Sequence, residues 1–262
     1  MESKNSWGIL VVIIIVILAI GGAYYYGGKG GNNASSTPAT ATSTDFATKF
    51  RAVDSSDHVR GDVNAPVKLV VYSDLECPAC KVFHQELLKL NDNYVKNGKV
   101  AIIFRPMPLL TLHPKSQKET EAALCVAELG GNEKFWSFID KVFEITPANN
   151  GLDEAKLPEI ANGLKIDAKS FSECLSSGKY TDTVKKNIDE GFNLGINGTP
   201  SFVMVGPGNN FLALADQQGQ SSNIITGAYP ADQLKQMIDS LTAPAPDAIA
   251  TTTDATATTS AR

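Results

Sequence analysis

The stretch Val67-Lys68-Leu69-Val70-Val71-Tyr72-Ser73, followed after three residues by Cys77-Pro78-Ala79-Cys80, decides the fold. The first run is apolar and rich in β-branched residues, which predicts a buried strand over 67–73. Apolar residues recur at helical spacing after the cysteines, which predicts a helix over 78–96. The pattern therefore places Cys77 at the N-terminus of a helix that directly follows a strand.

That position suits a reactive thiol. The unpaired N–H groups and the dipole of a helix N-terminus favour a thiolate, and a second thiol one turn further can resolve a mixed disulfide. We therefore predict thiol–disulfide exchange, with Cys77 as the attacking thiol and Cys80 as the resolving thiol. Pro78 fits the first turn of the predicted helix.

Two other interpretations of the cysteine pair are open. The pair could be half of a zinc site, which needs a second Cys or His pair at matching spacing. Cys125 and Cys174 are single, and the three histidines lack that spacing, so we expect no metal. The pair could also be two inert core cysteines.

The N-terminal residues predict a membrane segment. Residues 7–26 are almost wholly apolar and just long enough to cross a bilayer, with Trp7 and three tyrosines at the flanks. We expect residues 1–6 in the cytoplasm and an uncleaved anchor at 7–26, and a cleaved signal peptide is the alternative. Either one exports the rest of the chain.

The remaining composition divides the chain into a tether, a domain and a tail. Residues 27–44 are rich in Gly, Asn, Ser and Thr, which predicts a flexible linker, and residues 243–262 form an Ala/Thr/Pro-rich tail that we expect to be disordered. Residues 45–242 are enough for one domain. The formal charge of −5 comes without a basic stripe, which argues against nucleic acid as a partner.

Within the domain the order of elements predicts an α/β fold. A second strand is predicted over 100–104, and strand–helix–strand units of this length form right-handed parallel crossovers. Helices follow from about 107 to 194, and 116–119 reads as a capping box that begins one of them. Asn132 is expected to cap the next. A strand over 201–205, a hairpin partner or edge strand over 222–226 and a helix over 231–241 complete the domain.

This arrangement resembles the DsbA-like thiol–disulfide oxidoreductases of bacterial envelopes, which include membrane-anchored relatives of the BdbD and DsbG kind. The residues that carry the resemblance are 74–80, with Asp-Leu-Glu-Cys-Pro-Ala-Cys, and 195–202, with Gly-Ile-Asn-Gly-Thr-Pro-Ser-Phe. The similarity covers about residues 55–242. It implies a thioredoxin fold with a helical insertion, preceded here by one transmembrane helix.

The resemblance assigns roles to two further pairs. In that family the proline of the Thr-Pro pair is cis and faces the catalytic disulfide, so Thr199-Pro200 would dock the substrate backbone as an added strand. Without the cysteines, Pro200 would read as a proline that starts an edge strand. Some relatives have a disulfide across the insertion, and Cys125 and Cys174 match it. Two reduced core cysteines are the alternative.

The sequence departs from its relatives at two positions. Thioredoxin-fold enzymes often hold a buried acid where this chain has Val71. That acid exchanges protons with the second cysteine. Here Asp74 or Glu76 could exchange protons with Cys80 instead, or both could be solvated carboxylates at the strand end. Strongly oxidising relatives carry His at the position of Ala79. We therefore expect the helix terminus alone to lower the pKa of Cys77, against two opposing carboxylates. Pro78 and Ala79 would tune a potential less oxidising than that of DsbA.

These features together predict an enzyme that is held in the cytoplasmic membrane by one helix, with its catalytic domain on the extracytoplasmic side. Its substrates would be exported proteins that contain cysteines. No cofactor is needed, and the resemblance implies a quinone-linked membrane oxidoreductase of the DsbB kind as redox partner. A disulfide reductase or isomerase, and a redox-inactive binding or holdase module, are the alternatives, which the reduction potential of the cysteine pair distinguishes.

Overall fold

The computed structural model describes residues 44–215 and 220–243. The predicted anchor at 7–26, the segment before it, the linker up to residue 43 and the tail beyond residue 243 lie outside these residues. Within the described ranges, no helix combines the length and the apolar character that a bilayer crossing requires.

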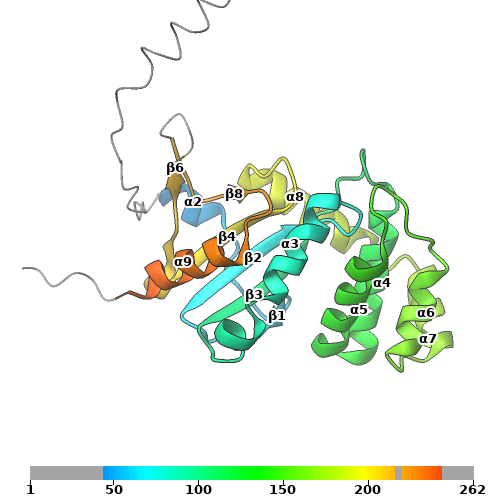
Figure 1. Cartoon of the computed structure of the whole chain (residues 1–262). Coiled ribbons are helices and arrows are strands. Elements are labelled where there is room, and N and C mark those ends of the chain that lie inside the picture. Colours follow the sequence, from blue (N-terminus) through cyan, green and yellow to red (C-terminus); the bar gives the residue numbers. More distant parts are fainter. Residues whose placement is uncertain (1–43, 216–219, 244–262) are drawn as a thin grey trace, which may run out of the picture. The chain divides into compact units, whose positions relative to one another are not determined.

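A mixed sheet forms the centre of the described chain (Figure 1). Its middle strand, β2 (Val67–Ser73), runs parallel to β3 (Val100–Pro106) and antiparallel to β4 (Ser201–Gly206). The order is β1-β3-β2-β4-β5, with β8 also paired to β4. The shorter strands are β1 (His58–Arg60), β5 (Asn210–Phe211) and β8 (Ile225–Thr226), and β6 (Leu214–Ala215) pairs separately with β7 (Ser221–Ser222).

The strand predictions are confirmed for the central strands and wrong in part at the edge. The region predicted as one strand over 222–226 divides between β7 and β8, and the hairpin partner of β4 is β5, which the sequence did not suggest. The reason is that Gly206 and the short 3₁₀ turn η2 (Pro207–Asn209) return the chain to β4 at once.

The two faces of the sheet are covered by different helices, because successive residues of a strand point to opposite sides. Leu69 and Val71 of β2 pack with α3 (Pro78–Leu88) and α9 (Ala231–Thr242). Val70 and Tyr72 lie on the other face. There the short helix α2 (Thr44–Lys49) leads to Phe50, which packs in that layer. Full burial of such side chains contributes about 1.5–3 kcal/mol each.

The helix after the cysteines is shorter than predicted. It ends at Leu88 and is followed by a π-helical turn, η1 (Asn91–Val95), in which the Val95 N–H bonds the Leu90 carbonyl at 3.1 Å. The wider turn keeps both Leu90 and Tyr94 buried. The spacing of these apolar residues predicted one continuous helix. In the structure an α-helix followed by a π-helical turn buries the same side chains.

The helical insertion contains five helices in the described chain: α4 (Ser116–Gly130), α5 (Asn132–Ile145), α6 (Lys156–Gly163), α7 (Ala168–Ser176) and α8 (Thr181–Leu194). Both predicted caps are wrong. Ser116 is the first residue of α4 and caps nothing, because its side chain is buried in the interior. Asn132 is the first residue of α5, and its amide bonds both the N–H and the carbonyl of Val59 in β1.

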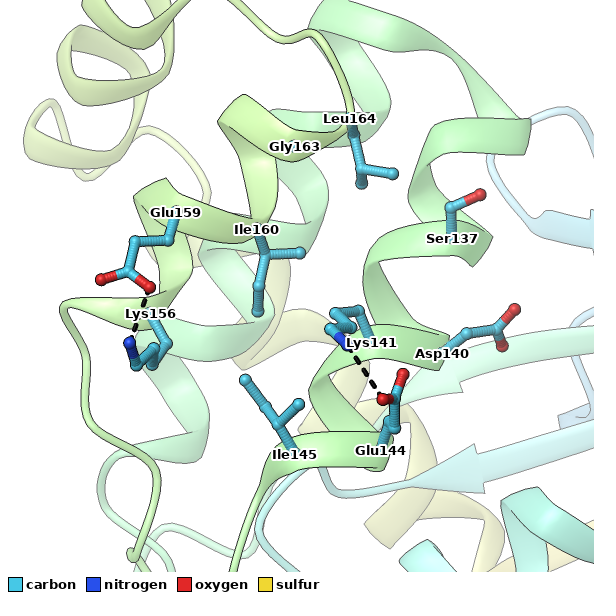
Figure 2. A pocket seen from close by; sticks show the side chains of 10 residues that line it. All are labelled: Ser137, Asp140, Lys141, Glu144, Ile145, Lys156, Glu159, Ile160, Gly163 and Leu164. Atoms are coloured by element: carbon cyan, nitrogen blue, oxygen red, sulfur yellow. Dashed lines mark hydrogen bonds and ion pairs between the residues drawn. The ribbon is translucent and has the colours of Figure 1, made fainter.

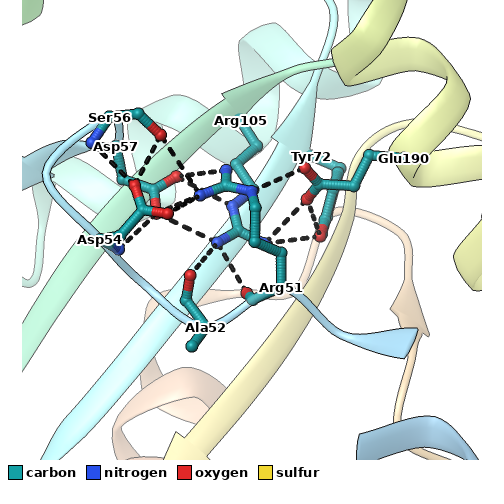
Figure 3. A network of polar contacts seen from close by, with 8 residues as sticks. All are labelled: Arg51, Ala52, Asp54, Ser56, Asp57, Tyr72, Arg105 and Glu190. Atoms are coloured by element: carbon teal, nitrogen blue, oxygen red, sulfur yellow. Dashed lines mark hydrogen bonds and ion pairs between the residues drawn. The ribbon is translucent and has the colours of Figure 1, made fainter. Parts of the chain in front are cut away.

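A buried ionic network joins the insertion to the Tyr72 face of the sheet (Figure 3). The side chain of Arg105 is 3% exposed and donates to Asp57 at 3.0 Å and to Glu190 of α8 at 2.9 Å. Arg51 donates to the same two carboxylates at 2.9 and 2.8 Å. Arg51 also pairs with Asp54 at 3.1 Å, so three acids face the two arginines, and the charge of the buried Arg105 has partners that offset its desolvation.

Candidate redox site

The end of β2 and the start of α3 hold the two cysteines. Cys77 occupies the N-cap of α3 with extended backbone angles, and Pro78 takes the first helical position, where its missing N–H costs nothing. The Cys77 N–H bonds the carbonyl of Asp74 at 3.2 Å and closes the turn between strand and helix. This places the Cys77 sulfur against the free N–H groups of the helix.

The two thiols have different surroundings. Cys77 is 7% exposed and Cys80 is 1% exposed, and both are free. A hydrogen bond from the Cys80 thiol lowers the pKa of Cys77 to about 6; backbone N–H groups of α3 help and burial opposes. Burial raises the pKa of Cys80 well above its usual value. One sulfur is therefore poised as a thiolate while the other keeps its proton.

This result corrects one expectation. The helix terminus was expected to act alone on Cys77, but the largest contribution comes from Cys80. The sulfur of Cys80 in turn accepts a hydrogen bond from the Asp74 N–H at 3.5 Å. Ala79, like Pro78, is exposed and presents no side-chain donor.

Thr199-Pro200 faces the cysteines from the other side of the site. The peptide bond between the two residues is cis. The Cys77 sulfur lies 3.3 Å from the carbonyl oxygen of Thr199, within reach of an S–H donor. Pro200 directly precedes β4, so the central sheet holds both halves of the site: β2 leads to the cysteines and β4 follows the Thr-Pro pair.

Asp74 is not the solvated strand-end carboxylate that the sequence permitted. It is fully buried, and one carboxylate oxygen accepts from the Glu76 N–H at 2.9 Å. The other accepts from the Leu109 N–H and from Nδ1 of His113, each at 2.8 Å. The carboxylate thereby binds the turn before Cys77 to the segment that leaves β3.

Glu76 is also fully buried and anchors a different loop. Its carboxylate accepts from the N–H groups of Gly151 at 3.1 Å and Leu152 at 3.0 Å. A weaker contact at 3.4 Å comes from the hydroxyl of Thr146. The sequence offered no sign of this arrangement, because the donors lie about seventy residues further along the chain in the α5–α6 connection.

Cys125 of α4 and Cys174 of α7 are joined by a disulfide, with 49 residues of sequence separation. The bond lies within the insertion. Among the described residues, no three His, Cys, Asp or Glu side chains are placed to hold a metal ion.

An apolar groove of about 270 Å³ adjoins the site. The residues that line the groove include Leu109, which follows β3 and whose N–H bonds Asp74. They also include Asn197, which lies two residues before Thr199. Leu112 is 64% exposed and Phe192 is 52% exposed along this groove. Large apolar side chains are thus exposed along the groove.

A larger pocket of about 730 Å³ lies elsewhere, between α5 and α6 (Figure 2). Its apolar lining residues are Ile145, Ile160 and Leu164. Two ion pairs also line it, Lys141 with Glu144 in α5 and Lys156 with Glu159 in α6. Neither Cys77 nor Cys80 lines this pocket.

With this geometry in place, the comparison with known proteins is direct. Residues 54–210 match the thioredoxin family. The chain belongs to that family. The "Probable disulfide bond formation protein D" of Bacillus anthracis is 27% identical over 160 residues, which cover 58% of this chain and 71% of that protein. The structure of Wolbachia pipientis α-DsbA1 matches 72% of this chain and 92% of its own, with a TM-score of 0.60 and 24% identity.

A further relative shows the same domain in another setting. The "Na(+)/H(+) antiporter NhaA 3" of Salinispora tropica is 32% identical over 150 residues, which cover 57% of this chain but only 22% of that protein. This thioredoxin-family chain therefore spans about a fifth of the length of that relative. The match concerns a domain and not the whole protein.

Proposed function

We propose that this thioredoxin-family protein is an extracytoplasmic thiol–disulfide oxidoreductase that introduces or exchanges disulfides in exported polypeptides. The observation that carries the proposal is the contrast between the two thiols, because the pKa of Cys77 is lowered to about 6 while that of the buried Cys80 is raised. At neutral pH, Cys77 is then both a nucleophile and a good leaving group.

The chemistry balances without a cofactor. In the oxidising direction, a substrate thiolate attacks the Cys77 sulfur of the Cys77–Cys80 disulfide, and the Cys80 sulfur leaves with the electron pair and takes up a proton. A second substrate thiolate attacks the substrate sulfur of the mixed disulfide and releases Cys77 as a thiolate. Two electrons pass from the substrate to the enzyme. In the reverse direction, Cys80 resolves the mixed disulfide.

The substrate would lie across Thr199 and the neighbouring groove. The Thr199 carbonyl is within 3.3 Å of the Cys77 sulfur, so an extended chain bound to this backbone brings its own cysteine to Cys77. Apolar side chains of an incompletely folded substrate fit the exposed Leu112 and Phe192. Pro78 and Ala79, which are exposed between the cysteines, would contact the substrate and tune the potential.

The cellular setting is part of the proposal. The apolar segment 7–26 supports a single-pass anchor in the cytoplasmic membrane, and the disulfide between Cys125 and Cys174 suits an oxidising compartment. The reduced enzyme needs an electron acceptor, for which a quinone-linked membrane oxidoreductase of the DsbB kind is the natural class. The names of the Bacillus relatives support a role in disulfide bond formation.

Trapping of mixed disulfides tests the proposal. Cys80→Ser leaves the attacking thiol without its resolving partner, so it should accumulate covalent adducts with exported proteins on non-reducing gels, whereas Cys77→Ser should accumulate none. Adducts on Cys77→Ser would reverse the assigned roles. Adducts on neither variant would favour a redox-inactive binding module.

A further inference from the structure

The buried acid Glu119 is explained neither by the fold nor by the proposed chemistry. It lies in the first turn of α4 and is fully buried. Neither of its carboxyl oxygens has a hydrogen-bond partner outside the acidic pair it forms with Glu76, and the Ser116 hydroxyl one turn away is also buried without a partner. A capping role would have placed both side chains at the helix end, in contact with backbone N–H groups.

Its neighbours make an ionised Glu119 costly. The carboxylates of Glu76 and Asp74 both raise its pKa, and Lys115, which directly precedes α4, opposes them. Asp74 in turn faces His113. A second unpaired carboxylate beside Glu76 would carry the full penalty of a buried charge. Burial, followed by the contact with Glu76, raises the pKa of Glu119 to about 9.

The hydrogen-bond donors around the pair are all on the Glu76 side, and neither carboxyl oxygen of Glu119 receives one. The Glu76 carboxylate accepts from two backbone N–H groups of the 146–152 loop and from the hydroxyl of Thr146. Donors of this kind favour the ionised form. The proton therefore belongs to Glu119, which as a neutral acid donates to the Glu76 carboxylate.

The loop that surrounds Glu76 shows how much of the local structure depends on this carboxylate. Ala148, Asn149 and Asn150 are three successive non-glycine residues with positive φ, at 65°, 53° and 64°. Such backbone persists only where the surroundings impose it. The loop is also tied to α3, because Lys81 donates to the carbonyl of Thr146 at 2.6 Å and the Asn149 N–H bonds the carbonyl of Glu76 at 2.8 Å.

We propose that Glu119 is a positioning residue of the redox centre, which holds a proton against Glu76 and thereby fixes the turn before Cys77 and limits the negative charge beside it. The proposal rests on the redox role of Cys77. Glu76 directly precedes Cys77 in the chain, so any movement or added charge at its carboxylate acts on the attacking sulfur. No proton transfer from Glu119 to the substrate is implied.

Three substitutions test this role. Glu119→Gln keeps the shape and an N–H donor toward Glu76 but cannot ionise, and Glu119→Leu removes the donor. Glu121→Gln is the matched control. Its carboxylate lies two residues further along α4 and is bonded to Gln117 at 3.0 Å and to Thr181 at 2.9 Å, away from the cysteines. The readouts are the thiolate absorbance of the reduced full-length protein against pH and the infrared spectrum of each reduced protein in the carboxylic acid C=O region.

Wild type, Glu119→Gln and Glu121→Gln should titrate Cys77 with one common midpoint near pH 6. Glu119→Leu should raise the titration midpoint of Cys77 by roughly half a pH unit, which is about a threefold fall in the acid dissociation constant of Cys77. The reason is that the charge of Glu76 is no longer partly offset by a hydrogen bond from Glu119. The wild-type infrared spectrum should contain a carboxylic acid C=O band that Glu119→Gln lacks and Glu121→Gln retains.

Two results would overturn the role. A marked fall in the Cys77 midpoint in Glu119→Gln would show that Glu119 is ionised in the wild type. Equal Cys77 midpoints in all four proteins, together with an infrared spectrum in which Glu119→Gln loses no acid band, would leave Glu119 as packing alone. If Glu119→Leu does not fold, the infrared comparison of wild type with Glu119→Gln decides. Failure of the wild type to exchange disulfides at all would instead refute the proposed function.

Discussion

Removal of the Cys80 thiol should raise the pKa of Cys77 from about 6 toward that of an ordinary cysteine, because the Cys80 hydrogen bond is the largest contribution that lowers it. A hydrogen bond to a charged group contributes about 1.5–3 kcal/mol, and 1.36 kcal/mol corresponds to one pKa unit. The loss is then roughly one to two units, which places the pKa of Cys77 in Cys80→Ala between about 7 and 8. The thiolate fraction at pH 7 would fall from roughly nine-tenths to between one-half and one-tenth.

The assay is the ultraviolet absorbance of the thiolate against pH. Of the four cysteines, Cys125 and Cys174 are bonded to each other, so in a Cys80 variant the signal comes from Cys77 alone. Cys80→Ser is the matched control, since its hydroxyl can still donate to the Cys77 sulfur. The expected order of Cys77 pKa values is wild type, then Cys80→Ser, then Cys80→Ala.

One outcome would refute this reasoning. If Cys80→Ala kept the pKa of Cys77 near 6, the backbone N–H groups of α3 would be sufficient by themselves. The expectation drawn from the sequence, that the helix terminus acts alone, would then be right and the structural interpretation wrong.

Two further predictions concern stability. Replacement of both Cys125 and Cys174 by Ala should lower the free energy of unfolding by about 4 kcal/mol, since the closed loop spans 49 residues, and should leave the Cys77 titration unchanged; a loss below about 1 kcal/mol in denaturant unfolding would contradict it. Asp57→Asn should lower the free energy of unfolding by about 3–5 kcal/mol, because it leaves the buried Arg105 with Glu190 as its one carboxylate partner among the described residues. Burial alone would raise the pKa of Asp57, but the hydrogen bonds from the two arginines outweigh it and lower the pKa. The ionised Asp57 therefore stabilises the folded protein fully above its unfolded pKa of about 4, and this contribution is lost as the pH falls further. The free energy of unfolding should then decrease more steeply with falling pH in the wild type than in Asp57→Asn.

The parts of the site that local sequence specifies were predictable. A buried strand followed by a proline-containing C-x-x-C pair places Cys77 at a helix N-terminus whatever the rest of the fold does, and the structure has Cys77 at that N-cap. The central strands followed from β-branched runs between glycine and proline. These features depend on neighbours within a few residues, where propensity and periodicity carry information.

The parts that depend on distant residues were not predictable. Ser116 and Glu119 have the spacing of a capping box, but tertiary burial turns both inward, and α4 begins instead after Lys115 without a side-chain cap. From the sequence, Asp74 and Glu76 could either take the place of the missing buried acid or be solvated carboxylates, and neither interpretation located their hydrogen-bond donors, which come from the segment after β3 and from the 146–152 loop. No periodicity in the sequence connects an acid to backbone N–H groups that far away.

The same distant donors explain how a thiolate forms beside two carboxylates. From the sequence, Asp74 and Glu76 should oppose ionisation of Cys77, and the absence of a His at position 79 should weaken it further. In the structure both carboxylates accept hydrogen bonds from their surroundings, which offset part of their negative charge. The acids therefore build the turn that presents Cys77, and the part of the Glu76 charge that remains is what Glu119→Leu is expected to increase. A Cys77 pKa of about 6 then lies between the values of about 7 for thioredoxin and 3.5 for DsbA, so we expect a reduction potential between about −270 and −120 mV.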